Sequence, residues 1–266
     1  MARELLPIHA VEEDIVRALE TCPRGIIQAP AGAGKSTHVP QMLLDRGLAG
    51  EGRVLVLQPR RLAARMLARR VAALRGTELG AEVGCQMRFE KILSARSRIV
   101  FITEGVLLRR MLADPDLADT TCIVFDEFHE RHLAGDIALA RALQLQRSTR
   151  PDLRLVVMSA TLATELVAAH LAPAPAVRAE VRPFPVEIEY LESPPGAEEQ
   201  VWDAAADAFR RCARAGVPGD VLIFMPGAHE IRRTLAALRA SPAAADCVLL
   251  PLHGDLPPGD QDAAFA

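Results

Sequence analysis

The sequence predicts an α/β fold in which a doubly wound parallel sheet is covered by helices on both faces. Short apolar runs alternate along the chain with longer segments of helical periodicity, as in parallel strands joined by helical crossovers. A glycine-rich loop also separates the first apolar run from the helical segment after it, an arrangement typical of sheets that bind phosphate groups. The 266 residues are enough for one large domain or two modest ones.

The elements expected in the first part of the chain alternate regularly. We expect strands at 25–28, 53–57, 98–102, 122–125 and 153–158, and helices at 35–45, 61–74, 105–112, 134–146 and 164–171. The prolines between 172 and 185 then predict a domain boundary, because proline disfavours helix in the residue before it and marks turns.

The alternation restarts beyond this boundary. We expect strands at 186–191, 221–225 and 247–250, helices at 200–215 and 228–240, and the start of another helix at the end of the sequence. A doubly wound domain needs about 100 to 150 residues, whereas about 80 follow the boundary. The sequence therefore predicts two domains, at 1–180 and 181–266, of which the second is incomplete.

Composition excludes several classes of protein. The five cysteines are scattered, odd in number and never spaced as Cys-x-x-Cys, which argues against a disulfide scaffold or a zinc site and favours a reduced setting. The first residues lead into the acidic Glu12-Glu13-Asp14, so we expect no signal peptide. No apolar run approaches the length of a membrane span. We therefore expect a cytoplasmic protein with no membrane partner.

The charge is distributed unevenly. The net charge of the chain is −3, but residues 53–110 contain twelve arginines and one lysine against four glutamates, a net of +9. A basic zone of this size is a candidate phosphate-binding surface. Taken alone, the charge is better explained by a solvated, arginine-rich helix face.

Residues 29–37, Ala-Pro-Ala-Gly-Ala-Gly-Lys-Ser-Thr, have the composition of a phosphate-binding loop. Lys35 is one of only two lysines in the chain, placed where a compact ammonium group can lie between phosphates. Gly32 and Gly34 let backbone N–H groups curve around an anion, and the Ser36 hydroxyl can coordinate Mg²⁺. Alanine at position 29 departs from the strict pattern, which has glycine there.

An acidic pair, Asp126-Glu127, directly follows the apolar run 122–125. In nucleotide hydrolases a carboxylate at the carboxyl end of a strand holds the Mg²⁺ that bridges phosphates, and a neighbouring carboxylate can polarise the attacking water. An acidic pair that caps the next helix is the alternative interpretation. The phosphate-binding loop earlier in the chain favours the metal site.

With these residues in view, the chain resembles the DEAH-type RNA helicases of superfamily 2. Six motifs of that family occur in order: the first motif at 29–36, motif Ia at 58–64, a segment at 83–90, motif Ib at 103–109, the second motif at 126–131 and motif III at 159–161. The first motif of this superfamily also explains the alanine at position 29. The phenylalanine in the second motif, Asp-Glu-Phe-His-Glu-Arg, together with Ile-Phe-Met-Pro-Gly at 223–227, resembles the bacterial HrpB-type helicases most closely.

The resemblance implies a fold and a nucleotide site. The fold is a RecA-like doubly wound sheet of the P-loop NTPase kind at 1–180, the helicase ATP-binding domain, followed at 181–266 by a partial RecA-like helicase C-terminal domain that lacks motifs V and VI. ATP and Mg²⁺ are the implied cofactors, and the residues implied to bind the nucleotide are Ala29, Pro30, Ala31, Gly32, Ala33, Gly34, Lys35, Ser36 and Thr37. Ser36, Asp126 and Glu127 would hold the metal, with Glu127 also orienting the water. His129 would couple hydrolysis to movement of the second domain, and Arg70 would stack on adenine unless it is simply a solvated helix residue.

The resemblance also implies contacts with single-stranded nucleic acid and favours RNA, while the residues themselves leave RNA and DNA both open. The residues expected near the strand are Arg60, Arg61, Arg88, Thr103, Glu104 and Gly105. Ser159, Ala160 and Thr161 would link the nucleotide site to this path, although they could also cap the following helix, and both roles are compatible.

Three functional hypotheses remain open at this point. The first is a motor fragment of an ATP-dependent RNA helicase, whose partners include the missing C-terminal segments. Arginine fingers from the second domain contribute about 10³ to 10⁵ in rate in such enzymes, and none is recognisable before Ala266. The second hypothesis is therefore a truncated nucleotide-binding module that binds ATP and RNA with little or no turnover. The third is a P-loop ATPase of another kind, against which the Pro-Arg-Arg and Thr-Glu-Gly strings argue.

Overall fold

The computed structural model describes residues 6–161, 165–180, 185–190 and 200–265. The chain divides into two compact units, Met1–Pro183 and Phe184–Ala266. Among the described residues, no helix combines the length and the apolar character needed to cross a bilayer.

The first unit is built on one sheet, which in the described part of the chain has eight strands in the order β4-β3-β5-β2-β6-β7-β1-β8. The strands are β1 (Arg24–Gln28), β2 (Arg53–Leu57), β3 (Val83–Met87), β4 (Glu90–Ile92), β5 (Ile99–Ile102), β6 (Thr120–Phe125), β7 (Arg154–Ser159) and β8 (Ala176–Arg178). All neighbours are parallel except the β3–β4 hairpin.

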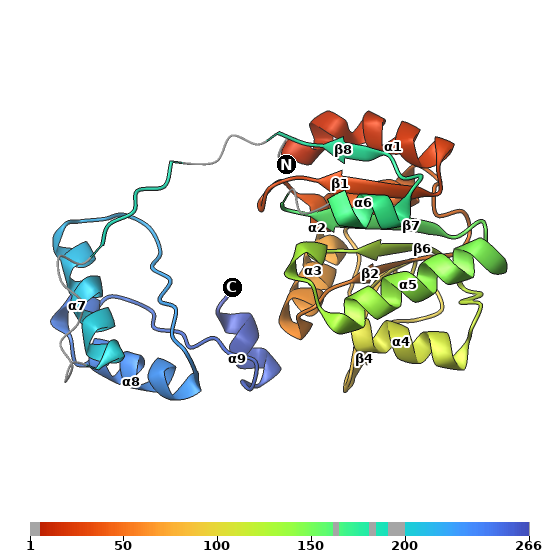
Figure 1. Ribbon diagram of the computed structural model, residues 1–266. Helices are drawn as coiled ribbons and strands as arrows, with labels where there is room; N and C mark the ends of the chain where they lie inside the picture. The colour runs from red at the N-terminus through yellow and green to blue at the C-terminus, as the bar shows by residue number, and fades with distance from the viewer. Residues whose placement is uncertain (1–5, 162–164, 181–184, 191–199, 266) are drawn as a thin grey trace. The chain divides into compact units, whose positions relative to one another are not determined.

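Helices cover both faces of this sheet (Figure 1). One face carries α1 (Glu12–Thr21), α2 (Lys35–Asp45) and α3 (Arg61–Leu74), and the other carries α4 (Glu104–Ala113), α5 (Leu133–Ser148) and α6 (Glu165–Leu171). Successive strand residues face opposite clusters, since Val54 and Val56 of β2 pack with the first set of helices while Leu55 and Leu57 pack with the second. The prediction of a doubly wound α/β fold is confirmed.

The order of the strands explains where a site can form. The chain leaves β1 through α2 and α3 toward β3 on one side of the sheet, then returns through α4, α5 and α6 toward β8. Parallel strands end at the same edge, so the loops after β1, β2, β5, β6 and β7 are brought together there. Ligands of open α/β sheets bind at this carboxyl edge, near the point where the strand order reverses.

Helix α1 and strands β3, β4 and β8 of the first unit were not expected. The sequence signals of β3 and β8 are weak for different reasons. Strand β3 contains Gly84 and Gln86, and β8 has only three residues inside the proline-rich stretch. Strand β8 exists because Ala176–Arg178 pairs with Ile26–Gln28 of β1, about 150 residues away, and no local pattern reports such a pairing.

The second unit contains α7 (Val201–Arg214), α8 (Ala228–Arg239) and the short α9 (Pro258–Ala263). The helices expected at 200–215 and 228–240 are confirmed. The strands expected at 186–191, 221–225 and 247–250 are wrong for the residues that the structure describes, none of which forms a ladder there. Apolar, β-branched runs predict a strand only where a neighbouring strand supplies hydrogen bonds.

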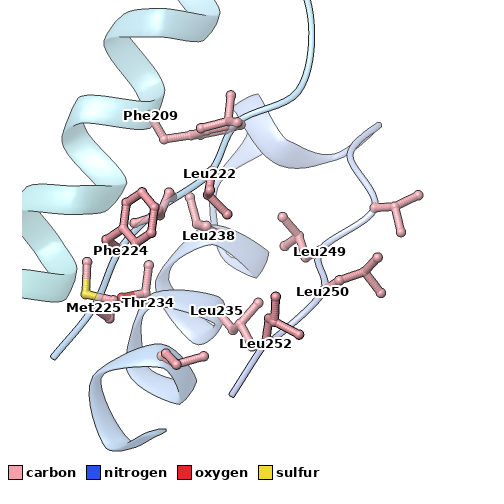
Figure 2. A pocket seen from close by; sticks show the side chains of 14 residues that line it. Phe209, Leu222, Phe224, Met225, Thr234, Leu235, Leu238, Leu249, Leu250 and Leu252 are labelled. Atoms are coloured by element: carbon pink, nitrogen blue, oxygen red, sulfur yellow. The ribbon is translucent and has the colours of Figure 1, made fainter. Parts of the chain in front are cut away.

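The apolar residues of the runs at 221–225 and 247–250 instead contribute to a cavity of about 310 Å³ beside α7 and α8 (Figure 2). Phe209, Thr234 and Leu238 contribute from the two helices, and the extended segments contribute residues 221–225, 248–250 and Leu252. Several of these side chains are largely exposed, Phe224 by 83%. The core of this unit among the described residues is correspondingly small and centres on Ala206, Phe209, Leu238 and Ala244.

Candidate functional site

The glycine-rich loop joins the end of β1 to the start of α2. Gly32 and Gly34 have φ angles of 79° and 90°, in the left-handed region that favours glycine. A Cβ atom on Gly34 would also lie 2.7 Å from Cδ1 of Leu6. Both backbone shape and crowding therefore require glycine at position 34, which gives the loop the curvature that exposes its N–H groups to an anion.

Lys35, the first residue of α2, is 4% exposed. Its Nζ atom donates hydrogen bonds to the carbonyl oxygens of Ala29, at 2.5 Å, and Pro30, at 3.0 Å. Burial lowers the pKa of Lys35, while the charges of Glu127 and Asp126 act in the opposite direction. The loop thus holds an ammonium group over its own backbone, close to the acidic pair that follows β6.

Asp126 lies at the end of β6 and is also 4% exposed. Burial raises the pKa of Asp126 to about 6; a hydrogen bond from Ser36 acts against this shift, and the charge of Glu127 adds to it. The backbone N–H of Glu127 donates to Oδ1 of Asp126 at 2.9 Å, and the side-chain amide of Gln58 donates to Oδ2. The carboxylate is therefore held in one orientation beside the phosphate-binding loop.

The sequence analysis gave Gln58 no role of its own. Gln58 is 1% exposed and directly follows β2, a strand that neighbours β6 in the sheet. A polar residue placed straight after an apolar strand was the available signal. Its partner Asp126 follows an equivalent strand, and parallel strands end at the same edge.

Glu127 occupies a left-handed conformation, with φ 50° and ψ 34°. For a residue other than glycine this conformation costs about 1 to 3 kcal/mol, and it is characteristic of functional sites. Its Oε2 atom lies 3.4 Å from Nδ1 of His129, which also accepts a hydrogen bond from the backbone N–H of Ala160 at 3.4 Å. His129 therefore connects the acidic pair to the segment that follows β7.

That segment, Ser159–Thr161, is tied to the phosphate-binding loop. The backbone N–H of Ala29 donates to the carbonyl oxygen of Ser159 at 3.1 Å. The Ser159 hydroxyl bonds within its own turn, to the carbonyl oxygen and N–H of Thr161. Whether this segment caps the next helix involves residues 162–164, which lie outside the described residues.

The residues expected to hold Mg²⁺ offer suitable ligands. Ser36 supplies a hydroxyl oxygen, and Asp126 and Glu127 supply carboxylate oxygens, which are the hard ligands that Mg²⁺ prefers. Ser36 lies close enough to Asp126 to act against the rise of its pKa, so two of these side chains are neighbours. The residues present fit the cation.

A cavity of about 770 Å³ extends from this loop between α2 and α3. Such a volume is ordinary for a cofactor site. Its walls include Gly32, Lys35, Ser36 and Glu127, and also Arg70, so the structure brings the arginine expected near adenine to the same cavity as the phosphate-binding loop. Leu6, His9 and His38 line it as well; the sequence analysis missed them because their contacts join distant segments.

The residues expected near nucleic acid lie at the carboxyl ends of the neighbouring strands β2, β5 and β3. Arg60 and Arg61 are exposed at the start of α3, and Arg60 forms an ion pair with Glu130 at 3.1 Å. Thr103 and Gly105 flank Glu104 at the start of α4; burial raises the pKa of Glu104, whose Oε1 lies 3.7 Å from Nδ1 of His132.

Arg88 lies farther along the same edge, in the turn of the β3–β4 hairpin. Its guanidinium group lies 4.8 Å from the ring centre of Phe89, which is 83% exposed. Arg88 also shares a hollow with Arg109 and Arg110 of α4. The residues expected to contact nucleic acid thus form a row along this edge of the sheet rather than one compact cluster.

Comparisons with known proteins agree with this geometry. The sequence profile of the DEAD/DEAH box helicase family matches residues 8–169. The "ATP-dependent RNA helicase HrpB" of Escherichia coli (strain K12) is 42% identical over 261 residues, which cover 98% of this chain and 32% of that protein. The "Probable ATP-dependent RNA helicase DHR2" of Saccharomyces cerevisiae is 35% identical over 277 residues, covering 99% of this chain and 37% of that protein.

A solved structure is similar over the same extent. The crystal structure of the Escherichia coli DEAH/RHA helicase HrpB matches with a TM-score of 0.88 and 41% identity, covering 98% of this chain and 33% of that one. The chain therefore spans about a third of the length of the relatives that it matches.

Proposed function

Because this chain belongs to the DEAD/DEAH box helicase family, we propose that it is the motor part of an ATP-dependent RNA helicase, which couples ATP binding and hydrolysis to movement on, or unwinding of, RNA. The observation that carries the proposal is the meeting of Lys35, Asp126 and Glu127 at one edge of the sheet, over a cavity large enough for a nucleotide. The names of the relatives, ATP-dependent RNA helicases, support the choice of substrates.

The residues of the chain divide the chemical work between them. Lys35 leaves the carbonyl oxygens of the loop to neutralise charge on the β- and γ-phosphates, and the N–H groups of the loop bind the same oxygens. Ser36 and Asp126 would hold Mg²⁺, and the cation would supply positive charge that stabilises the transferring phosphate. Glu127 orients the attacking water and accepts its proton, and its carboxylate lies 3.4 Å from Nδ1 of His129.

The contacts with RNA connect to the nucleotide site through one short segment. Glu130, which pairs with Arg60, is three residues from Glu127, and His129 between them contacts Ala160. A displacement of this segment when phosphate leaves would change the ion pair that restrains Arg60. Backbone phosphates contacted by arginines give binding that is tolerant of sequence and sensitive to salt.

The test compares the two lysines of the chain. Lys35→Ala is expected to lower the affinity for a fluorescent ATP analogue by more than ten-fold, since a buried cation that pairs with phosphate is lost, whereas the exposed Lys91→Ala keeps the affinity of the wild type. Unchanged affinity in Lys35→Ala overturns the proposal. Binding that depends on Lys35 without phosphate release, even with RNA present, identifies the chain as a nucleotide-binding module without turnover.

A further inference from the structure

The segment Leu6–Val11 packs directly on the phosphate-binding loop. The backbone N–H of Ile8 donates to the carbonyl oxygen of Ala33 at 3.0 Å, and the Ile8 side chain is fully buried. A Cβ atom on Gly34 would lie 2.7 Å from the side chain of Leu6 and 3.2 Å from the side chain of Ile8. This segment therefore fixes one carbonyl group of the loop and covers its last glycine.

A chain of hydrogen bonds through two histidines holds the segment in place. The backbone N–H of Leu6 lies 3.0 Å from Nδ1 of His9, Nε2 of His9 lies 3.2 Å from Nδ1 of His38, and Nε2 of His38 lies 2.7 Å from Oε2 of Glu12. Because a backbone N–H can only donate, Nδ1 of His9 is an acceptor and its Nε2 carries the hydrogen. The donor-to-acceptor direction is then the same in the next two bonds: Nε2 of His9 donates to Nδ1 of His38, and Nε2 of His38 donates to Glu12.

The far end of this chain is anchored to the end of α2. Arg46 donates through Nε to Oε1 of Glu12 at 3.0 Å and also pairs with Glu13. Burial alone raises the pKa of Glu12, but the hydrogen bonds from His38 and Arg46 outweigh it and lower the pKa. The carboxylate is thus an ionised acceptor, which strengthens the last bond of the chain.

The histidine pair lies beside the proposed nucleotide site. Leu6, His9 and His38 line the same cavity as Lys35 and Arg70. All four ring nitrogens of the two histidines have partners within the protein. The pair is therefore suited to positioning the protein around a ligand rather than to bonding with the ligand.

We propose that Leu6–Val11 is a positioning segment of the nucleotide site, seated on the phosphate-binding loop by the hydrogen bond between His9 and His38, so that the seated segment and a bound nucleoside triphosphate stabilise each other. The inference rests on the proposed function. The physical reason is that a loop which binds an anion through its N–H groups loses conformational freedom on binding, and the seated segment removes part of that freedom beforehand.

The first experiment measures the affinity of the full chain for a fluorescent, non-hydrolysable ATP analogue with Mg²⁺. His9→Ala is expected to lower the affinity at least about five-fold, the lower end of typical coupling between sites. His9→Gln can still donate to His38 from a similar position and is expected to restore most of the affinity. His9→Asn can accept from Leu6 but cannot reach His38, so it is expected to behave like His9→Ala. The exposed His170→Ala is the matched control.

The second experiment needs no substitution and covers the case in which a variant fails to fold. Coupling is reciprocal, so the ATP analogue is expected to slow hydrogen exchange at the amide of Ile8, which bonds to Ala33. If exchange at Ile8 is unchanged by saturating nucleotide, or if a folded His9→Ala binds like the wild type, the positioning role is overturned while the proposed function stands. If the wild-type chain binds no nucleotide, both are overturned.

Discussion

The side-chain amide of Gln58, at the end of β2, donates a hydrogen bond to Oδ2 of Asp126, at the end of β6. These strands are neighbours in the sheet, with Leu57 paired to Phe125. The bond favours the ionised form of a carboxylate whose burial favours the protonated form. One amide from the motif Ia segment therefore supports the proposed metal ligand of the second motif.

Replacing Gln58 by leucine tests this support. The variant keeps the approximate volume of the side chain and removes the donor, so the pKa of Asp126 should rise further and its orientation should loosen. We expect the Mg²⁺ concentration needed for half-maximal ATP binding to rise on the order of ten-fold, as for other groups that orient metal ligands. Gln144→Leu, on the exposed face of α5, should leave it unchanged. An equal Mg²⁺ requirement in Gln58→Leu and wild type would show that this bond does not tune the metal site.

Asp126 predicts a dependence of stability on pH in metal-free buffer. The pKa of this carboxyl group is about 6 in the folded chain against 3.8 for an unperturbed aspartate. Between these values the folded state binds more protons than the unfolded state, so the free energy of unfolding falls as pH rises from about 4 to 6 and then levels off. Asp126→Asn lacks this loss and is expected to be more stable than wild type at pH 8 by on the order of 1 to 3 kcal/mol.

Urea unfolding followed by circular dichroism, with EDTA present, measures this difference. The two proteins should converge below about pH 4, where Asp126 is protonated in both states. Glu20→Gln, at an exposed position of α1, is the control substitution for changes in expression and handling. A constant difference between Asp126→Asn and wild type across this range contradicts the effect of burial.

Local patterns in the sequence predicted which residues form much of the proposed nucleotide site. Residues of the phosphate-binding loop are adjacent in the chain, and their glycines and Lys35 report the required backbone shape directly. Asp126-Glu127 could be placed at the carboxyl edge because parallel strands all end there. Each of these inferences depends on residues within one strand–loop–helix unit, where spacing determines position.

Contacts between distant segments could not be predicted in this way. Gln58 meets Asp126, and His9 meets His38, because the sheet and α2 bring separate segments together. The second unit shows the opposite error, since the apolar residues at 221–225 have the composition of a strand but no ladder partner among the described residues. In all three cases the structure depends on hydrogen-bond partners in distant segments, which local composition does not reveal.

The ion pair between Arg60 and Glu130 predicts opposite effects of two substitutions on RNA binding. Arg60→Ala removes a proposed phosphate contact and should reduce the slope of log affinity against log salt by about 0.7, the value for one phosphate of a single strand. Glu130→Gln removes the carboxylate that competes with phosphate for Arg60 and should raise the affinity at low salt. Titration of a labelled single-stranded RNA at several salt concentrations measures both.

The control for these titrations is Arg147→Ala, an exposed arginine on α5, which should keep the slope of the wild type. The affinity of Arg60→Ala for the ATP analogue should also be unchanged. Charge reversal of Arg60 and Arg61 together extends the test. If that variant lost ATP binding and kept RNA binding, an ATPase of another kind would be favoured over a helicase motor.

Arg70 distinguishes recognition of the base from recognition of the phosphates. Arg70 of α3 lines the same cavity as the phosphate-binding loop, which precedes α2. Stacking of a guanidinium group on an aromatic ring at an exposed site is worth about 0.5 to 1 kcal/mol. Arg70→Ala should therefore weaken ATP binding about two- to five-fold and leave the binding of inorganic tripolyphosphate unchanged. Competition of both ligands against the fluorescent analogue measures the two effects. Equal losses of affinity for ATP and tripolyphosphate would mean that Arg70 acts through its charge alone. Unchanged affinity for both would mean that Arg70 is a solvated residue of α3 with no role in nucleotide binding.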